Sequence, residues 1–153
     1  MNEEQNQVLE WNKSMSVGNE LLDNQHKQLL KQIGVLKFAL LSGDAVERLR
    51  EIGEFLENYI KQHLSEEEKY MLEYNYPGYE NHKKIHDWAR QKFAELLARF
   101  FNENEDKMQL AKDVERYLHD WWINHITVED KKYADYINKL KVGQKNTNNT
   151  ENE

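Results

Sequence analysis

The sequence contains no cysteine, only one proline and six glycines in 153 residues. Without cysteine the chain can form no disulfide, no thiolate zinc site and no iron–sulfur cluster. Proline and glycine are the residues that most often break helices or form tight turns. Because the chain has few of them, long helices are favoured over many short strands. The chain is long enough to bury one substantial core, and 39% of its residues are hydrophobic. These features indicate one all-α domain.

The sequence also lacks an excess of basic charge and lacks long apolar runs. Its formal net charge is -7, which disfavours nucleic acid as a partner because phosphate binding needs a basic face. No run approaches the roughly 18 apolar residues of a membrane span. The N-terminus has neither the basic region nor the apolar region of a signal peptide. We therefore expect a cytoplasmic protein that binds neither nucleic acid nor membrane.

The spacing of apolar residues predicts four long helices. Apolar side chains recur every three or four positions, which is the period of an amphipathic helix. The predicted helices cover residues 19–41, 45–74, 79–101 and 107 to about 140. Short connections between them predict an up-down-up-down four-helix bundle, because short loops join antiparallel neighbours.

The remaining segments are expected to flank this bundle. Residues 1–18 are predicted to form an N-terminal arm, with Trp11 as its anchor, and residues 19–140 the bundle itself. Residues 141–153 are rich in Asn, Thr and Glu without periodicity, which predicts a disordered C-terminal tail. Asp44 is placed to cap the second helix, with Glu47 completing the pattern of a capping box.

Each predicted helix carries at least one histidine within its apolar face. The five are His26, His63, His82, His86 and His125. A spacing of four residues puts Glu67 on the same face as His63, and His86 on the same face as His82. One histidine on an apolar face is usually a packed core residue. Five histidines together with a buried carboxylate are different, because a buried charge without a partner is costly and one metal site would satisfy them all.

Other polar residues near these positions are interpreted differently. His119 precedes His125 by six residues and so points away from the inward face, which makes it a surface or supporting residue. Glu66 and Glu68 flank Glu67 but face elsewhere on the helix, and we interpret both as solvated charges. The tryptophans and tyrosines are expected to serve mainly in the core.

Four motifs in order along the chain resemble the signature of the hemerythrin family. They are the lone His26, HxxxE at His63–Glu67, HxxxH at His82–His86 and HxxxxD at His125–Asp130. The resemblance covers roughly Trp11 to Leu140, and all seven motif positions match.

The resemblance implies two non-haem iron ions. His82, His86 and His125 would bind one ion, and His26 and His63 the other. Glu67 and Asp130 would bridge the two ions together with an oxo or hydroxo group. Such a set fills all but one of the roughly twelve positions of two octahedral ions. The position left open, on the ion with two histidines, implies reversible binding of dioxygen. The resemblance places Trp122 and Ile126 in the oxygen pocket, and Leu29 and Leu30 lie beside His26.

The spacing between His125 and Asp130 does not suit a regular α-helix. In a regular α-helix, a residue five positions after His125 lies about 140° away from it around the helix axis. Glu129, four positions after His125, would lie nearer to the same face. Either the helix has a local π-type irregularity, or Asp130 reaches the site from another angle. We predict that Asp130, and not Glu129, is the bridging carboxylate.

Reversible oxygen binding competes with other functions. A di-iron oxidase is less favoured, since ferritin-like oxidases use Glu-x-x-His motifs and mostly carboxylate ligands, and this chain has no such motif. An oxygen or redox sensor would need a partner that distinguishes two states. Iron storage ranks last, because two tightly held ions per chain store little. Transport, storage, delivery and scavenging of oxygen remain open.

Overall fold

The computed structural model describes the backbone of residues 10–150 and the side chains of residues 10–144. Helices are the only regular elements in this part of the chain. Two of them, η3 and η4, are π-helical segments inside the last long helix. The bounds are η2 (Lys13–Met15), α1 (Glu20–Ser42), α2 (Ala45–Glu73), α3 (Tyr79–Phe100), α4 (Lys107–Arg116), η3 (Tyr117–Trp122), η4 (His125–Glu129) and α5 (Asp130–Thr150).

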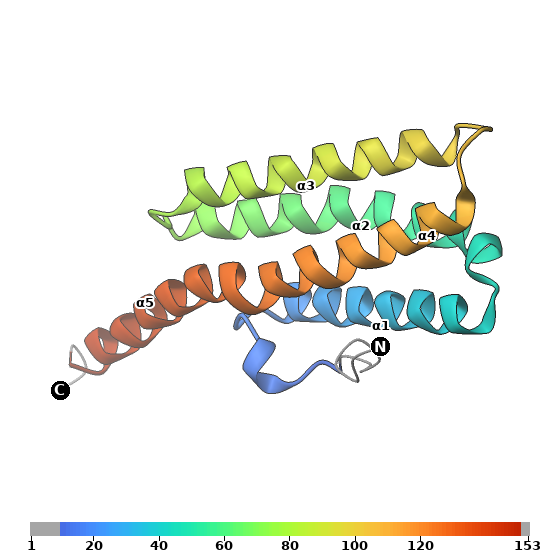
Figure 1. Ribbon diagram of the computed structural model, residues 1–153. Coiled ribbons are helices and arrows are strands. Elements are labelled where there is room, and N and C mark those ends of the chain that lie inside the picture. Colours follow the sequence, from blue (N-terminus) through green and yellow to red (C-terminus); the bar gives the residue numbers. More distant parts are fainter. Residues whose placement is uncertain (1–9, 151–153) are drawn as a thin grey trace.

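The helices form the predicted antiparallel four-helix bundle (Figure 1). The fourth rod of the bundle is the continuous run from α4 through η3 and η4 into α5, which packs against α1 and α3. The all-α fold class is therefore confirmed. None of the helices between residues 10 and 150 combines the length and hydropathy needed to span a bilayer.

Local sequence signals place the helix ends. The side chain of Asn19 accepts a hydrogen bond from the backbone N–H of Leu22 at the start of α1, and Asp106 does the same for Gln109 at the start of α4. Gly43 ends α1 with a φ of 85°, a left-handed conformation that glycine adopts without steric cost. The predicted cap at Asp44 is wrong, because its side chain makes no capping hydrogen bond and its backbone is not extended as capping requires.

The N-terminal arm is tied to the bundle by polar contacts. The carboxylate of Asp23 accepts hydrogen bonds from the backbone N–H of Val17, at 2.8 Å, and from the hydroxyl of Ser16, at 2.6 Å. Trp11 packs against the core as expected, and the ammonium of Lys27 lies 4.3 Å from the centre of its ring. Residues 1–9 of the predicted arm lie outside the described residues.

The chain beyond Lys141 differs from expectation. We predicted disorder from residue 141, whereas α5 continues through Thr150. The segment has no proline, and extending an existing helix requires no new nucleation, so residues of middling propensity can continue it. Residues 151–153 of the predicted tail lie outside the described part of the chain.

The apolar core is divided into two clusters. The larger fills most of the bundle, and the smaller gathers around Tyr133 near the end where α2 joins α3. Along each rod of the bundle, the histidines identified in the sequence fall between or beside these clusters. The polar residues are therefore enclosed by apolar packing on both sides along the bundle axis.

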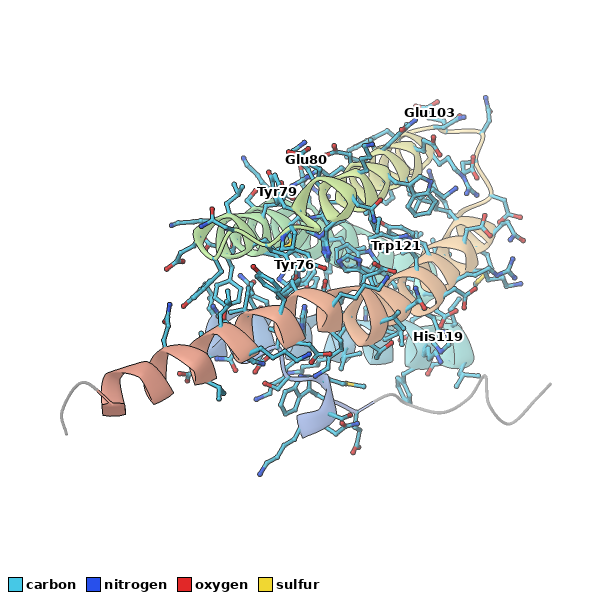
Figure 2. The ribbon with its side chains drawn as sticks, turned by 90° about the vertical axis from the view of Figure 1, so that its left-hand side faces the viewer. Tyr76, Tyr79, Glu80, Glu103, His119 and Trp121 are labelled. Atoms are coloured by element: carbon cyan, nitrogen blue, oxygen red, sulfur yellow. The ribbon has the colours of Figure 1, made fainter. Side chains whose placement is uncertain are left out.

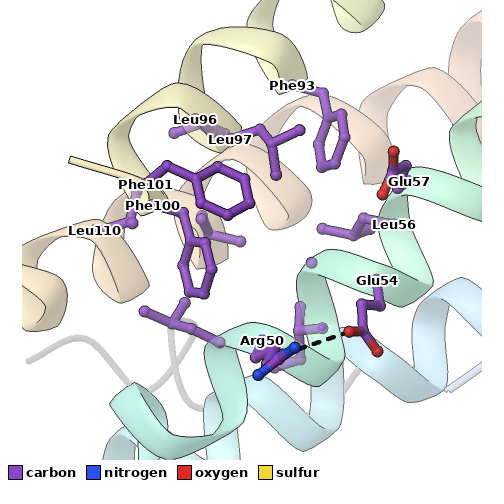
Figure 3. A pocket seen from close by; sticks show the side chains of 14 residues that line it. Arg50, Glu54, Leu56, Glu57, Phe93, Leu96, Leu97, Phe100, Phe101 and Leu110 are labelled. Atoms are coloured by element: carbon purple, nitrogen blue, oxygen red, sulfur yellow. Dashed lines mark ion pairs between the residues drawn. The ribbon is translucent and has the colours of Figure 1, made fainter.

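An apolar cavity of about 390 Å³ lies in the larger cluster, between α2, α3 and α4 (Figure 3). Leu56, Phe93 and Val114 are among its lining residues, and Arg50 pairs with Glu54 at 3.5 Å beside it. On α2 and α3, the lining residues lie in the half of the helix that does not contain the histidines. The cavity is therefore separate from the candidate site.

Candidate metal centre

The structure brings all seven residues of the four motifs into one buried cluster. Each helix contributes from its inward face, as the four-residue spacings predicted. No member is more than 3% exposed: the seven are His26, His63, Glu67, His82, His86, His125 and Asp130. Their donor atoms form two groups that share the two carboxylates.

One group contains three histidines. The Oε1 atom of Glu67 lies 3.0 Å from the Nε2 atoms of His82 and His86, and 3.4 Å from that of His125. The Oδ1 atom of Asp130 lies 2.9 Å from Nε2 of His125. Five donor atoms from α2, α3, η4 and α5 thus surround one point.

The second group contains two histidines and uses the other oxygen of each carboxylate. The Oε2 atom of Glu67 lies 3.1 Å from Nε2 of His63 and 3.6 Å from Nε2 of His26. The Oδ2 atom of Asp130 lies 3.2 Å from the same nitrogen of His26. Each carboxylate therefore directs one oxygen at each group, which is the arrangement of a bridge between two cations.

The donor atoms have a spacing that suits ligands of octahedral metal ions. Ligands about 2.1 Å from an octahedral ion and at right angles lie about 3.0 Å apart. The Nε2 atoms of His26 and His63 are 3.1 Å apart, and the carboxylate contacts fall in the same range. The buried Oε2 of Glu67 and both carboxylate oxygens of Asp130 accept no hydrogen bond. Because unpaired buried polar atoms are costly, the cluster fits a pair of cations.

A π-helical turn brings Asp130 into this cluster. The segment η4 covers His125–Glu129, and the backbone N–H of Asp130 donates to the carbonyl oxygen of His125, five residues earlier. This wider turn aligns residues five apart on one face. Glu129 points instead to Lys132, at 3.1 Å. Of the two possibilities raised by the spacing, the local π-type irregularity is therefore the one that the structure contains.

The charges in the cluster shift its pKa values in opposite directions. Burial opposes protonation of His26, His82 and His125, but contacts with Asp130 and Glu67 outweigh it. They raise the pKa of His26 and of His82 to about 9, and that of His125 to about 10. The carboxylates respond reciprocally: burial opposes their ionisation, yet the histidines hold the pKa of Glu67 and of Asp130 well below their ordinary values.

His63 behaves differently from these three histidines. Burial is the largest influence on it and lowers its pKa, despite the neighbouring carboxylate of Glu67. Without metal, the protons of His26, His82 and His125 therefore compensate the buried carboxylates.

Two residues outside the motifs hold the histidine rings in place. The Nδ1 atom of His63 lies 2.7 Å from Oε1 of Gln25, and Nδ1 of His86 lies 2.7 Å from Oε2 of Glu68, which also accepts from Arg90 at 2.6 Å. The interpretation of Glu68 as a solvated charge is therefore wrong. An Nδ1–H group that donates to an oxygen leaves Nε2 free to bind metal, so these contacts fix the tautomer that the site needs.

Aromatic rings stack on two of the histidines. The ring of Tyr59 is nearly parallel to that of His63, with centroids 4.9 Å apart. Trp121 stacks on His125 at the same distance, with an angle of 9° between the planes. These contacts limit rotation of the imidazoles.

The residues assigned to the oxygen pocket are all buried. Leu29, Leu30, Trp122 and Ile126 belong to the same apolar cluster, and none is more than 4% exposed. The ring centre of Trp122 lies 6.4 Å from that of His63 and 5.9 Å from that of His125.

His119 lies outside the cluster, as predicted. It contacts Asp120 at 3.1 Å, and Figure 2 shows it on the opposite side of the helix from Trp121.

Comparison with known proteins agrees with this geometry. Residues 17–137 match the family model described as the Hemerythrin HHE cation binding domain. The chain is 29% identical to a bacteriohemerythrin of Stenotrophomonas maltophilia, with 85% of this chain and 82% of the relative aligned. It is 30% identical to a bacteriohemerythrin of Pseudomonas paraeruginosa, with coverage of 84% and 81%. A bacteriohemerythrin of Campylobacter jejuni is 29% identical, with coverage of 81% and 91%. The chain is therefore a metal-binding protein of the hemerythrin family.

Proposed function

We propose that the protein binds dioxygen reversibly at a centre of two non-haem iron ions. The observation that carries this proposal is the division of the cluster into unequal halves, with three histidines on one side and two on the other. Both carboxylates are shared between the halves. With a bridging oxo or hydroxo group, the half with two histidines would keep one coordination position open. Bound in this way, two ferrous ions would supply the electrons and the open position that dioxygen requires.

Each of the seven clustered residues would have a defined role in binding the two ions. His82, His86 and His125 would hold one ion, His26 and His63 would hold the other, and Glu67 and Asp130 would be shared between them. Neutral imidazoles keep the total ligand charge low, which favours the ferrous state over the high-valent states used by oxidases. This supports oxygen binding in preference to oxidation of a substrate.

The packing around the site supports reversibility. Leu29, Leu30, Trp122 and Ile126 would form the oxygen pocket, and their burial would keep water away from the centre. Gln25 and Glu68 keep the imidazoles oriented through their Nδ1 atoms. Exclusion of water removes the protons that would otherwise drive irreversible oxidation.

The test is a visible spectrum of the iron-loaded, anaerobically reduced protein, recorded before air, after air and after argon flushing. We expect a charge-transfer band that appears with oxygen and fades when oxygen is removed. The variant H125A should lose the band together with iron, whereas H119A should behave as the unchanged protein because His119 lies outside the cluster. Prompt conversion to the ferric state without a reversible band would overturn the proposal in favour of a redox sensor or an oxidase.

A further inference from the structure

Two buried tyrosine hydroxyls lie beside the candidate metal centre. The ring of Tyr59 contacts that of His63, and the ring of Tyr133 contacts that of His82. Among the side chains of residues 10–144, these two hydroxyls are buried without a hydrogen bond of regular geometry. A buried O–H group without a partner is costly, so each hydroxyl points to an interaction that has still to be identified.

Tyr133 reaches the centre from α5. It follows Asp130 by three residues, which places both side chains on the same face of the helix. Its fully buried ring packs edge-on against the ring of His82, with centroids 5.5 Å apart and 67° between the planes. Tyr70 and Tyr76 also pack edge-on against it, at 6.2 Å and 6.4 Å. These contacts hold the ring beside the half of the centre with three histidines.

The hydroxyl of Tyr133 lies beside the carboxylate of Glu67. Burial, the charges of Glu67 and Asp130, and a hydrogen-bond contact with Glu67 raise the pKa of Tyr133 well above its ordinary value. A hydroxyl that keeps its proton can donate to a carboxylate, which only accepts. The buried Oε2 of Glu67 has no donor of its own among the described residues. A donor and an acceptor, both unpaired, therefore lie side by side.

Tyr59 is placed differently. Its ring lies parallel to that of His63, with 14° between the planes, and not edge-on. Burial and the charges of Glu67 and Asp130 raise its pKa as well, but no hydrogen-bond contact with either carboxylate contributes. Of the two tyrosines, Tyr133 is therefore the one that is placed to donate to a shared carboxylate.

Glu67 would still be able to accept a hydrogen bond with an ion on each of its oxygens. A carboxylate offers about four lone-pair positions, and two ions would use two of them. A hydrogen bond to a carboxylate ligand draws electron density away from the metal, and outer contacts of this kind tune a metal site. Ferric ions depend on that density more than ferrous ions because their charge is higher. Such a hydrogen bond therefore favours the ferrous state.

We propose that Tyr133 is a positioning residue that donates a hydrogen bond to Glu67 in the iron-loaded protein and thereby stabilises the ferrous state. The proposal rests on the proposed function, because it assigns a residue that keeps iron in the oxidation state that binds dioxygen. The tyrosine acts through Glu67 alone: its oxygen does not bind iron, and its proton stays on the hydroxyl.

The first experiment measures the midpoint potential of the iron-loaded protein by an anaerobic titration that is followed by absorption. We expect Y133F to favour the ferric over the ferrous state about tenfold more than the unchanged protein, since losing an outer hydrogen bond typically changes metal affinity about 10- to 100-fold. For one electron, this is a potential about 59 mV lower. Phenylalanine keeps the ring, so the packing against His82 should persist.

Y70F is the matched control for this potential. Tyr70 is also buried, belongs to the same apolar cluster and packs against Tyr133, but its hydroxyl accepts a hydrogen bond from Lys141 at 2.9 Å. Its variant should keep the potential of the unchanged protein. An unchanged potential in Y133F, or an equal shift in Y70F, would overturn the proposal.

An infrared measurement tests the hydrogen bond without iron. Zinc binds imidazole and carboxylate ligands and has no redox chemistry. The difference spectrum between zinc-loaded and metal-free protein isolates the carboxylates that bind metal. We expect their stretching bands to move in Y133F and to stay in place in Y70F. Identical bands in all three proteins would show that Tyr133 does not donate to Glu67. Failure to bind dioxygen reversibly, with both effects of Y133F present, would count against the proposed function alone.

Discussion

Asp130 and Glu129 are adjacent carboxylates with opposite surroundings. Asp130 is fully buried among histidines, whereas Glu129 pairs with Lys132 near the surface. We expect D130A to lose most of its iron and its visible bands, because each half of the centre loses a shared oxygen. E129A should retain both. Metal analysis and absorption spectra of the two variants, prepared side by side, provide the check, and loss of iron from E129A alone would show that the bridge has been misassigned.

Glu68 acts on the site through the imidazole of His86. Removing such an outer hydrogen-bond partner typically weakens metal affinity about 10- to 100-fold. We expect this loss for E68Q, because a neutral amide holds the Nδ1 proton of His86 less strongly than a carboxylate that is 2.7 Å away. Competition with a chelator measures it. E66Q is the control, since Glu66 makes no hydrogen bond or ion pair within the described side chains. Equal iron retention by both variants would remove Glu68 from the site.

At the scale of single elements, Gly53 is a helical glycine with room for a larger residue. An ideal Cβ at this position meets no atom within 4 Å, and its backbone conformation suits other residues. We expect G53A to stabilise the protein by about 0.5–1 kcal/mol, because alanine loses less backbone entropy in a helix. Thermal melts should show a rise of a few degrees.

The contrasting variant is G78A. A Cβ at Gly78 would lie 2.7 Å from the ring of Tyr76, so this substitution should lower the melting temperature. If G53A also lowers it, the space beside Gly53 is not available to a methyl group.

The sequence predicts the helices, the five histidines and Glu67 from spacing alone, whereas Asp130 is predicted only through the resemblance to a known family. His63 and Glu67, four residues apart, must share a face once the helix forms. The same reasoning misses Glu68 and Gln25, since each adjoins a motif residue and lies about 100° away on the helix. Their role depends on which neighbouring helix their side chains meet. The failed cap at Asp44 has a similar origin, because the hydrogen bond depends on backbone angles that residue type alone does not fix.

For the whole molecule, the charges of the cluster predict a stability that depends on pH and on metal. In the metal-free protein, the pKa values of His26 and His82 are raised to about 9 and that of His125 to about 10. A raised histidine pKa stabilises the fold below the unfolded value of about 6.5, and this stability is lost as pH rises through the folded values. The lowered pKa values of the two carboxylates act in the other direction, and their contribution is lost in acid.

We therefore expect the melting temperature of the metal-free protein to fall between about pH 6.5 and 10. The iron-loaded protein should not share this fall, because metal replaces the protons, and it should instead release iron in acid as protons compete for the ligands. Melts followed by circular dichroism at several pH values, with and without iron, distinguish the two forms. A metal-free protein whose melting temperature rises from pH 6.5 to 9 would show that the histidines are not protonated.

The π-helical turn at η4 also governs how the chain can vary in length. A turn that holds one extra residue rotates everything after it by about 100° relative to an uninterrupted α-helix. The buried face of α5, formed by Tyr133, Ala134 and Ile137, depends on that rotation to meet the smaller core cluster. Forcing all of these residues into regular α pitch would swing both Asp130 and this face out of the bundle, as would inserting one more residue, whereas deleting Val128 would leave Asp130 four residues after His125 and so near the same face. Thr127 and Val128 are exposed, so their identities are free to change between relatives, and the loss of one residue can be absorbed by a change from π to α pitch, whereas an added residue cannot.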